Sequence, residues 1–115
     1  MRISSVERKI LWAAIEDYAG LWELIWELAT SCPEISEPER RSVAERVVRD
    51  LLEHNCIELY ERSEIGGKER PVPRGRWDNL LSSEANWHEP STKSTEVLIG
   101  ATPAGEEVYA AEVND

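Results

Sequence analysis

Three stretches with helical periodicity fill the first half of this 115-residue sequence and require a core built mainly from helices. The stretches cover about residues 5–18, 21–29 and 36–54. Ser4 and Glu7 have the spacing of a capping box at the first helix, and Ser36 and Glu39 repeat it at the third. A chain of this length forms about one domain, so the three helices are expected to share one hydrophobic core.

The second stretch is apolar on two sides, which is more than one core contact needs. One side carries leucine and isoleucine, and the other carries Trp22 and Trp26. Because aromatic residues dominate the energetics of burial, we expect Trp12, Trp22 and Trp26 to lie mainly in the core. The alternative is that these tryptophans form the interface with a second copy or another partner. Trp77 and Trp87 are candidates to cover them within one chain.

Two short strands and a last helix follow in the second half. Strand-like segments occur at residues 56–61 and 97–101. Thr102 and Pro103 then have the form of a helix start, and this helix is expected to run to about residue 112. Val108 and Ala111 are predicted to face inward. The expected fold class is therefore α+β, mainly α.

The segment between the two strands is long and has little periodicity. The glycines at 66–67 predict a turn, and the basic residues 68–76, punctuated by proline, predict extended irregular structure. A short helical turn is predicted at 77–81 from the spacing of its apolar residues. Residues 86–95 show no period and are expected to form a surface loop.

Charge is distributed unevenly along the sequence, whose net charge is −10. Residues 1–39 carry three basic and eight acidic residues, and residues 77–115 carry one basic and eight acidic residues. Residues 40–76 hold nine of the 13 cations against seven acids. The overall charge argues against nucleic acid, whereas this basic middle third allows it. The simpler interpretation is that Arg and Glu alternate on solvated faces.

The passage Val97–Tyr109, VLIGATPAGEEVY, resembles the returning wing strand and the Thr-x-x-Gly helix start of MarR-like and PadR-like winged helix-turn-helix regulators. The third helix and the strand CIELYE after it are similar to the recognition helix and first wing strand of such domains. The resemblance covers residues 5–112 and implies a single winged-helix domain over 1–115. The chain departs from the pattern in the wing, because an insertion at about 62–95 contains its own short helix.

The resemblance implies a transcription-regulator-like protein that binds double-stranded DNA as a homodimer. In this family the third helix enters the major groove and the wing approaches the DNA backbone. Arginine suits such contacts because its planar donors match phosphate and guanine. The DNA-contacting residues that the resemblance implies are Arg40, Arg41, Arg46 and Arg49 on the third helix, with Lys68 and Arg70 near the wing tip.

The same residues also allow a second hypothesis about their role. Arg41, Glu45 and Arg49 are spaced by four, so they can form an intrahelical ion-pair ladder instead of contacting DNA. Glu37 and Glu39 lie on or beside the same helix and would repel phosphates. The alternative function is an acidic winged-helix module for protein–protein interaction, regulatory or inhibitory, which could imitate nucleic acid. An insertion folded over the third helix would favour this alternative.

Catalytic and metal-binding patterns are weak in this sequence. Cys32, His54, Cys56 and His88 are residue types that zinc uses, but no C-x-x-C pair occurs, and buried thiols are the simpler interpretation. The sequence does not indicate a Cys–His catalytic arrangement or a phosphate-binding glycine loop. We therefore expect neither enzymatic activity nor a bound metal or cofactor.

The sequence also predicts where the protein resides. Its longest apolar run, at 10–15, is far shorter than the roughly 20 residues that span a bilayer. No pattern typical of a signal peptide is present, and two cysteines are compatible with a reducing cytosol. We expect a cytoplasmic protein without membrane contact.

Overall fold

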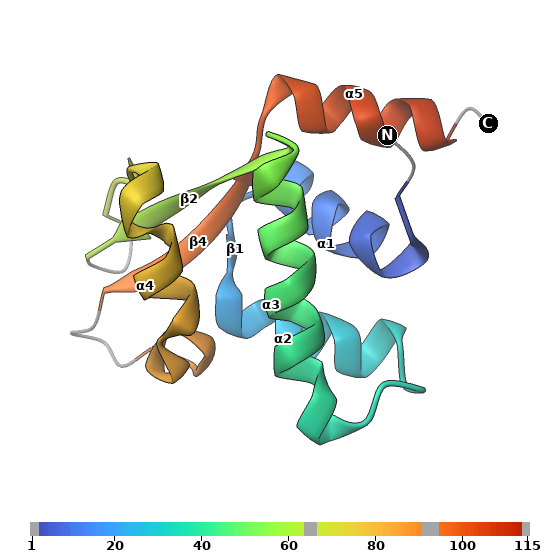
Figure 1. The fold of residues 1–115 in the computed structure, drawn as a ribbon, viewed down its shortest axis with the longest axis horizontal. Coiled ribbons are helices and arrows are strands. Elements are labelled where there is room, and N and C mark those ends of the chain that lie inside the picture. The colour runs from blue at the N-terminus through green and yellow to red at the C-terminus, as the bar shows by residue number, and fades with distance from the viewer. Residues whose placement is uncertain (1–2, 64–66, 91–94, 114–115) are drawn as a thin grey trace.

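Five α-helices and one small sheet dominate the structure, a computed structural model that describes residues 3–63, 67–90 and 95–113 (Figure 1). In chain order the elements are α1 (Ser5–Glu16), β1 (Ala19–Gly20), α2 (Leu21–Ser31), α3 (Glu37–Glu53), β2 (Ile57–Arg62), β3 (Arg70–Pro71), the 3-10 helix η1 (Arg74–Arg76), α4 (Trp77–Ser82), the 3-10 helix η2 (Glu84–Trp87), β4 (Glu96–Ala101) and α5 (Pro103–Val113). The predicted α+β, mainly helical class is confirmed. Within the described ranges, no helix is long and apolar enough to cross a membrane.

The four strands form one antiparallel sheet in the order β1-β4-β2-β3. Strand β4 pairs with β2 on one side, where Leu59 lies opposite Ile99, and with β1 on the other, where Gly20 lies opposite Leu98. The strands predicted at 56–61 and 97–101 are confirmed within one residue at each end. Sequence reasoning missed β1 because two residues are too few to show alternation.

The ends of the first helices differ partly from the prediction. The capping box at α1 is confirmed, since Ser4 Oγ accepts the N–H of Glu7 at 3.2 Å and the Glu7 carboxylate accepts the N–H of Ser4 at 3.1 Å. The helix ends earlier than expected because Asp17 adopts an extended backbone and Ala19 begins to pair with β4. Ser36 occupies the N-cap position of α3 without a side-chain hydrogen bond, so the second predicted capping box is wrong.

The core lies between α1, α2, α3 and one face of the sheet. Its largest fully buried side chains on these elements are Ile10, Leu11, Leu21, Leu24, Leu28, Leu51, Ile57, Leu59 and Ile99. The opposite face of the sheet carries Tyr18 and Tyr60, whose rings meet edge to face with centroids 4.8 Å apart. Gly100 lies beneath them, and a Cβ there would come within 2.9 Å of both rings. The glycine therefore permits this aromatic pair to approach the sheet.

The insertion between β2 and β4 is more ordered than expected. The predicted irregular stretch at 68–76 contains β3 and η1, and the predicted short helix is α4. The surface loop predicted from residue 86 is wrong at its start, because Trp87 is buried and its indole N–H donates to the carbonyl of Leu81 at 2.9 Å. Leu81, Val72 and Trp87 belong to the common hydrophobic core. Gly66 of the predicted turn and residues 91–94 of the predicted loop lie outside the described residues.

Helix α5 starts where the Thr-x-x-Gly pattern predicts. Thr102 Oγ1 accepts the N–H of Gly105 at 3.0 Å and donates to the carbonyl of Asn55, which has a positive φ of 59°. At Gly105 a Cβ would overlap the carbonyl oxygen of Cys56, so the glycine allows α5 to rest against the end of α3. Val108 is half-buried as predicted, whereas Ala111 is exposed, contrary to the prediction. Figure 1 shows α5 passing across the same end of the molecule as α1.

Candidate functional site

The side of α3 that carries Arg41 and Arg49 faces the insertion. Both arginines form ion pairs with Glu45, at 3.2 and 3.1 Å, so the predicted ladder is present. Arg49 also reaches Asp78 at 3.0 Å and the hydroxyl of Ser82 at 3.2 Å, both on α4. Two of the four arginines that the DNA hypothesis needs on this helix therefore bind groups of the same chain.

Arg41 makes a second set of contacts with the insertion. Its Nη2 atom donates to the carbonyl of Leu81 at 3.4 Å, and its guanidinium carbon lies 5.7 Å from the centre of the Trp87 ring. A pocket lined by Arg49, Leu52, Glu53, Trp77 and Leu81 separates α3 from α4 farther along. Figure 1 shows α4 beside α3. The insertion thus covers one side of the third helix.

The remaining surface of α3 is acidic. Its exposed residues are Glu37, Pro38, Glu39, Ser42, Arg46, Asp50 and Glu53. Arg46 is the basic member of this set, against four carboxylates. Arg40 is half-buried, and its Nε atom is buried with no hydrogen-bond partner among the described residues. The structure therefore does not arrange the four helix arginines as one exposed basic surface.

The two basic residues predicted near the wing tip are exposed at the far edge of the sheet. Arg70 lies on β3 and donates to the hydroxyl of Ser63 at 3.0 Å, and Lys68 precedes it. The strand order places Arg70 on the edge strand of the sheet, beyond β2. Lys68 and Arg70 share a shallow pocket with Gly67.

Most other cations of the middle third are bound by carboxylates. Arg76 forms a bidentate pair with Glu61 at 2.8 and 3.1 Å, and these hydrogen bonds raise the pKa of Arg76. Arg74 lies 3.6 Å from Glu53, and its guanidinium packs over the ring of Trp77. Sequence reasoning missed these pairs because the partners come from other elements. Five of the nine cations in residues 40–76 are therefore paired with carboxylates, whereas Arg40, Arg46, Lys68 and Arg70 form no ion pair within the described residues.

The tryptophans expected in the core lie instead at two separate places on the surface. Trp12 on α1 is 44% exposed and stacks on Tyr109 of α5, with ring centroids 5.2 Å apart. Trp26 on α2 is 62% exposed and meets Trp22 edge to face at 5.2 Å and 85°. The expectation of burial is therefore wrong for Trp12 and Trp26. Trp87 is buried in the core and leaves Trp26 open to solvent.

Trp22 is half-buried and held by a chain of polar contacts that crosses the sheet. Its indole N–H donates to Glu96 at 2.9 Å, and the other oxygen of Glu96 accepts from Arg62 at 2.9 Å. Arg62 also binds Glu69 at 3.1 Å, and the hydrogen bond to Glu96 is the main cause that raises the pKa of Arg62. At Gly20 a Cβ would come within 2.6 Å of Glu96 and 2.7 Å of the Trp22 nitrogen. The glycine thus makes room for this hydrogen bond.

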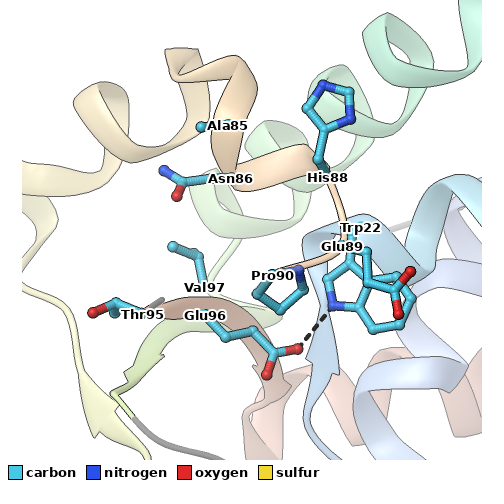
Figure 2. A pocket seen from close by; sticks show the side chains of 9 residues that line it. All are labelled: Trp22, Ala85, Asn86, His88, Glu89, Pro90, Thr95, Glu96 and Val97. Atoms are coloured by element: carbon cyan, nitrogen blue, oxygen red, sulfur yellow. Dashed lines mark hydrogen bonds between the residues drawn. The ribbon is translucent and has the colours of Figure 1, made fainter. Parts of the chain in front are cut away.

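A small cleft lies beside Trp22, between η2 and β4 (Figure 2). It has a volume of about 150 Å³. Figure 2 shows Glu89 and Pro90 next to the indole of Trp22, with Glu96 reaching the indole from β4. Glu89 and His88 are exposed. The cleft therefore combines an aromatic wall with carboxylates.

The residues considered for metal binding do not converge. No group of three His, Cys, Asp or Glu side chains suited to a metal ion occurs in residues 3–63, 67–90 and 95–113. Cys32 and Cys56 are both buried, and burial raises the pKa of the Cys56 thiol. His54 lies against the carbonyl of Asp50 at 2.8 Å, and His88 is exposed near Glu84.

No family model, no curated protein and no solved structure matches this chain.

Proposed function

We propose that this chain is a non-enzymatic, acidic winged-helix module that binds other proteins rather than DNA. The order α1-β1-α2-α3-β2-β4-α5 supports the winged helix-turn-helix interpretation, because three helices lead into two antiparallel strands and a closing helix. The β3, η1, α4 and η2 elements then form the extended wing.

One observation favours protein over DNA: groups of the insertion bind two of the arginines of α3. Arg49 is bound by Asp78, and Arg41 by the carbonyl of Leu81. A recognition helix needs free side chains that reach base edges in the major groove. Because Leu81 and Trp87 are buried in the common core, moving the insertion aside would expose core surface. We therefore expect the insertion to stay in contact with this side of α3.

Charge supports the same choice. DNA-binding surfaces use Lys and Arg to neutralise phosphates, which are present at every base step. The exposed residues of α3 carry four carboxylates and one guanidinium, and the chain as a whole carries −10. An acidic surface of this kind attracts basic partners and repels nucleic acid.

We extend the proposal to a homodimer formed through α1 and α5. Trp12 and Tyr109 stack across these two helices, and Arg8 lies 5.5 Å above the Tyr109 ring. A partly exposed aromatic stack of this kind is typical of the centre of an interface. Light scattering after size-exclusion chromatography should give the mass of a dimer, and Trp12→Ala should shift the equilibrium to monomer. A wild-type monomer at high concentration would contradict this part of the proposal.

DNA binding provides the direct test. Fluorescence anisotropy with a labelled random-sequence duplex should show no binding at about 50 mM or about 200 mM salt. Arg46→Ala is the informative variant, and Lys9→Ala, on α1, is its charge-matched control. Salt-sensitive binding that Arg46→Ala weakens and Lys9→Ala does not would establish α3 as a DNA-binding helix and overturn the proposal.

A further inference from the structure

We propose that the surface formed by Trp22 and Trp26 on α2 binds an Arg- or Lys-rich segment of a partner protein. This inference rests on the proposed function and deepens it, because it names the surface and the chemistry of the partner. The surface is defined by the two tryptophans and by the cleft beside Trp22 that also contains Glu89 and Glu96.

Within the aromatic part of this surface, Trp22 is held in place before any partner arrives. Trp22 is fixed by its hydrogen bond to Glu96, and Glu96 is fixed in turn by Arg62. Trp26 stands at 85° to Trp22, so the two rings form an open corner. With 62% of its surface exposed, Trp26 offers a large apolar area to a partner. A prearranged site loses less entropy on binding than one that must first be ordered.

The described segments on either side of this corner are acidic, and Lys93, between Pro90 and Thr95 of the cleft, lies outside the described residues. Residues 10–39, which include all of α2, contain seven acidic residues and no Lys or Arg. Residues 77–90, which include α4 and η2, contain three acidic residues and no Lys or Arg. Helix η2 packs against α2, so these two segments meet beside Trp22. The field at the tryptophan corner therefore favours a positively charged partner.

In the described residues, Arg62 is the one cation that contacts the network at Trp22. It does not make the local electrostatic potential positive. Arg62 reaches Glu96 from β2 and is bound at the same time by Glu69. Two carboxylates therefore surround one guanidinium. Glu89, at the mouth of the cleft, is exposed and adds a further negative charge.

A guanidinium or ammonium group matches the aromatic and the acidic parts of this surface together. The face of an indole ring attracts cations more strongly than the other aromatic rings do, and Arg also stacks on it through its plane. Glu89 lies beside the rings and is exposed, so its carboxylate attracts the same positive charge. An uncharged apolar segment would use the tryptophans but would gain nothing from Glu89.

Binding of a defined basic peptide tests this assignment. The probe is a fluorescein-labelled peptide of about ten residues that alternates Arg and Ser, and a version with Gln in place of Arg serves as the uncharged control. Anisotropy should show binding of the Arg peptide only. Trp26→Ala should weaken this binding about five- to tenfold, as expected for the loss of a cation–π contact. Trp12→Ala is the matched control, because it removes another exposed tryptophan without changing the net charge. Since Trp12 also lies in the proposed dimer interface, wild type and both variants are compared at a concentration at which sedimentation shows each to be monomeric. Under these conditions Trp12→Ala should change the affinity by less than about twofold.

A second measurement does not depend on substitution. The chain contains five tryptophans, so ¹⁹F NMR of protein labelled with 5-fluorotryptophan should give five resonances. Addition of the Arg peptide should move those of Trp22 and Trp26 and leave that of Trp12 unchanged. Uniform small shifts, or equal affinities of the Trp26→Ala and Trp12→Ala variants, would mean that only the overall charge attracts the peptide and would overturn the inference.

Other occupants give distinct results. If Trp26→Ala, and not Trp12→Ala, abolishes self-association in sedimentation experiments, the corner is covered by a second copy and the inference is wrong. If duplex DNA binds through Arg46 while the peptide still requires Trp26, the proposed function fails and this inference survives. If DNA does not bind and the peptide binds independently of Trp26, the inference fails and the proposed function survives.

Discussion

The side-chain hydroxyl of Thr102 donates a hydrogen bond to the backbone carbonyl of Asn55, 47 residues earlier in the chain. The same oxygen accepts the N–H of Gly105 in the first turn of α5. One hydroxyl thus caps the last helix and ties it to the turn that follows α3. Asn55 adopts positive φ in that turn, which Asn tolerates better than most residues.

Loss of this hydroxyl should destabilise the fold. Thr102→Val removes the helix cap and leaves the Asn55 carbonyl without its donor, so we expect unfolding free energy to fall by about 1–2 kcal/mol. Thr102→Ser keeps the hydroxyl and should stay close to wild type. Urea titration followed by circular dichroism measures both. Equal stability of the Val and Ser variants would show that the bridge contributes nothing.

An added methyl group should destabilise the fold at Gly105 but not at Gly75. At Gly105 the new Cβ would overlap the carbonyl oxygen of Cys56, whereas at Gly75 nothing lies within 4 Å. Gly105→Ala should therefore cost about 1–3 kcal/mol through overpacking. Gly75→Ala should be nearly neutral. Thermal unfolding of the two variants compares them directly, and similar midpoints would contradict the close approach of α5 to Cys56.

The insertion should contribute strongly to stability through one side chain. Trp87 is buried, so Trp87→Ala should lower the unfolding free energy by about 3–5 kcal/mol. Trp26→Ala removes the same side chain from a mainly exposed position and should have little effect on stability. If Trp87→Ala were as stable as Trp26→Ala, the insertion would not belong to the core, and the argument against DNA binding would lose its basis.

The network at Trp22 should depend on the charge of Glu96. The two oxygens of Glu96 accept hydrogen bonds from Trp22 and from Arg62, and the amide of Glu96→Gln has one acceptor oxygen for these two donors. We therefore expect the free energy of unfolding to fall by about 1–3 kcal/mol. The same change at the exposed Glu84 should have no measurable effect. Chemical denaturation provides the comparison. A neutral Glu96→Gln would mean that the network contributes little to stability.

Stability should fall at alkaline pH because of Tyr60. Burial, then the hydrogen bond to Glu58 and its charge, raises the pKa of Tyr60 to about 12, from a usual value of about 10. Between these values the unfolded chain loses the phenolic proton while the folded chain keeps it, so rising pH favours unfolding. This contribution is complete below about pH 10 and disappears as pH rises through about 12.

Tyr60→Phe has no proton to lose and should show a smaller decline in this interval. Urea midpoints at about pH 9 and about pH 11.5 test this, with Tyr109→Phe as the control for a general effect of tyrosine removal. Identical declines of wild type and Tyr60→Phe would show that the folded environment does not hold this proton.

Local signals in the sequence predicted most of the helices and strands. The Ser4 and Glu7 capping box and the start of α5 at Thr102 each depend on residues close in sequence, and both are confirmed. Trp87 was assigned to a surface loop because its neighbours show no periodicity. Its burial depends on packing of η2 against α2, which no local pattern records.

The candidate site was predicted less well than the fold for the same reason. The pairing of Arg41 and Arg49 with Glu45 follows from their spacing and was anticipated. The contacts of Arg49 with Asp78 and of Trp22 with Glu96 join segments far apart in the chain. Clustering of cations in the sequence therefore did not become one basic surface, because five of the nine cations in residues 40–76 form ion pairs with carboxylates of the chain.

The burial of Trp87 also limits how this domain could be shortened. Replacing the segment between β2 and β4 with a two-residue turn would remove the Trp87 indole from the core and leave a cavity there. The insertion therefore supplies part of the hydrophobic core. A shorter connection between β2 and β4 would need a bulky residue from elsewhere in the chain to fill the space that Trp87 occupies.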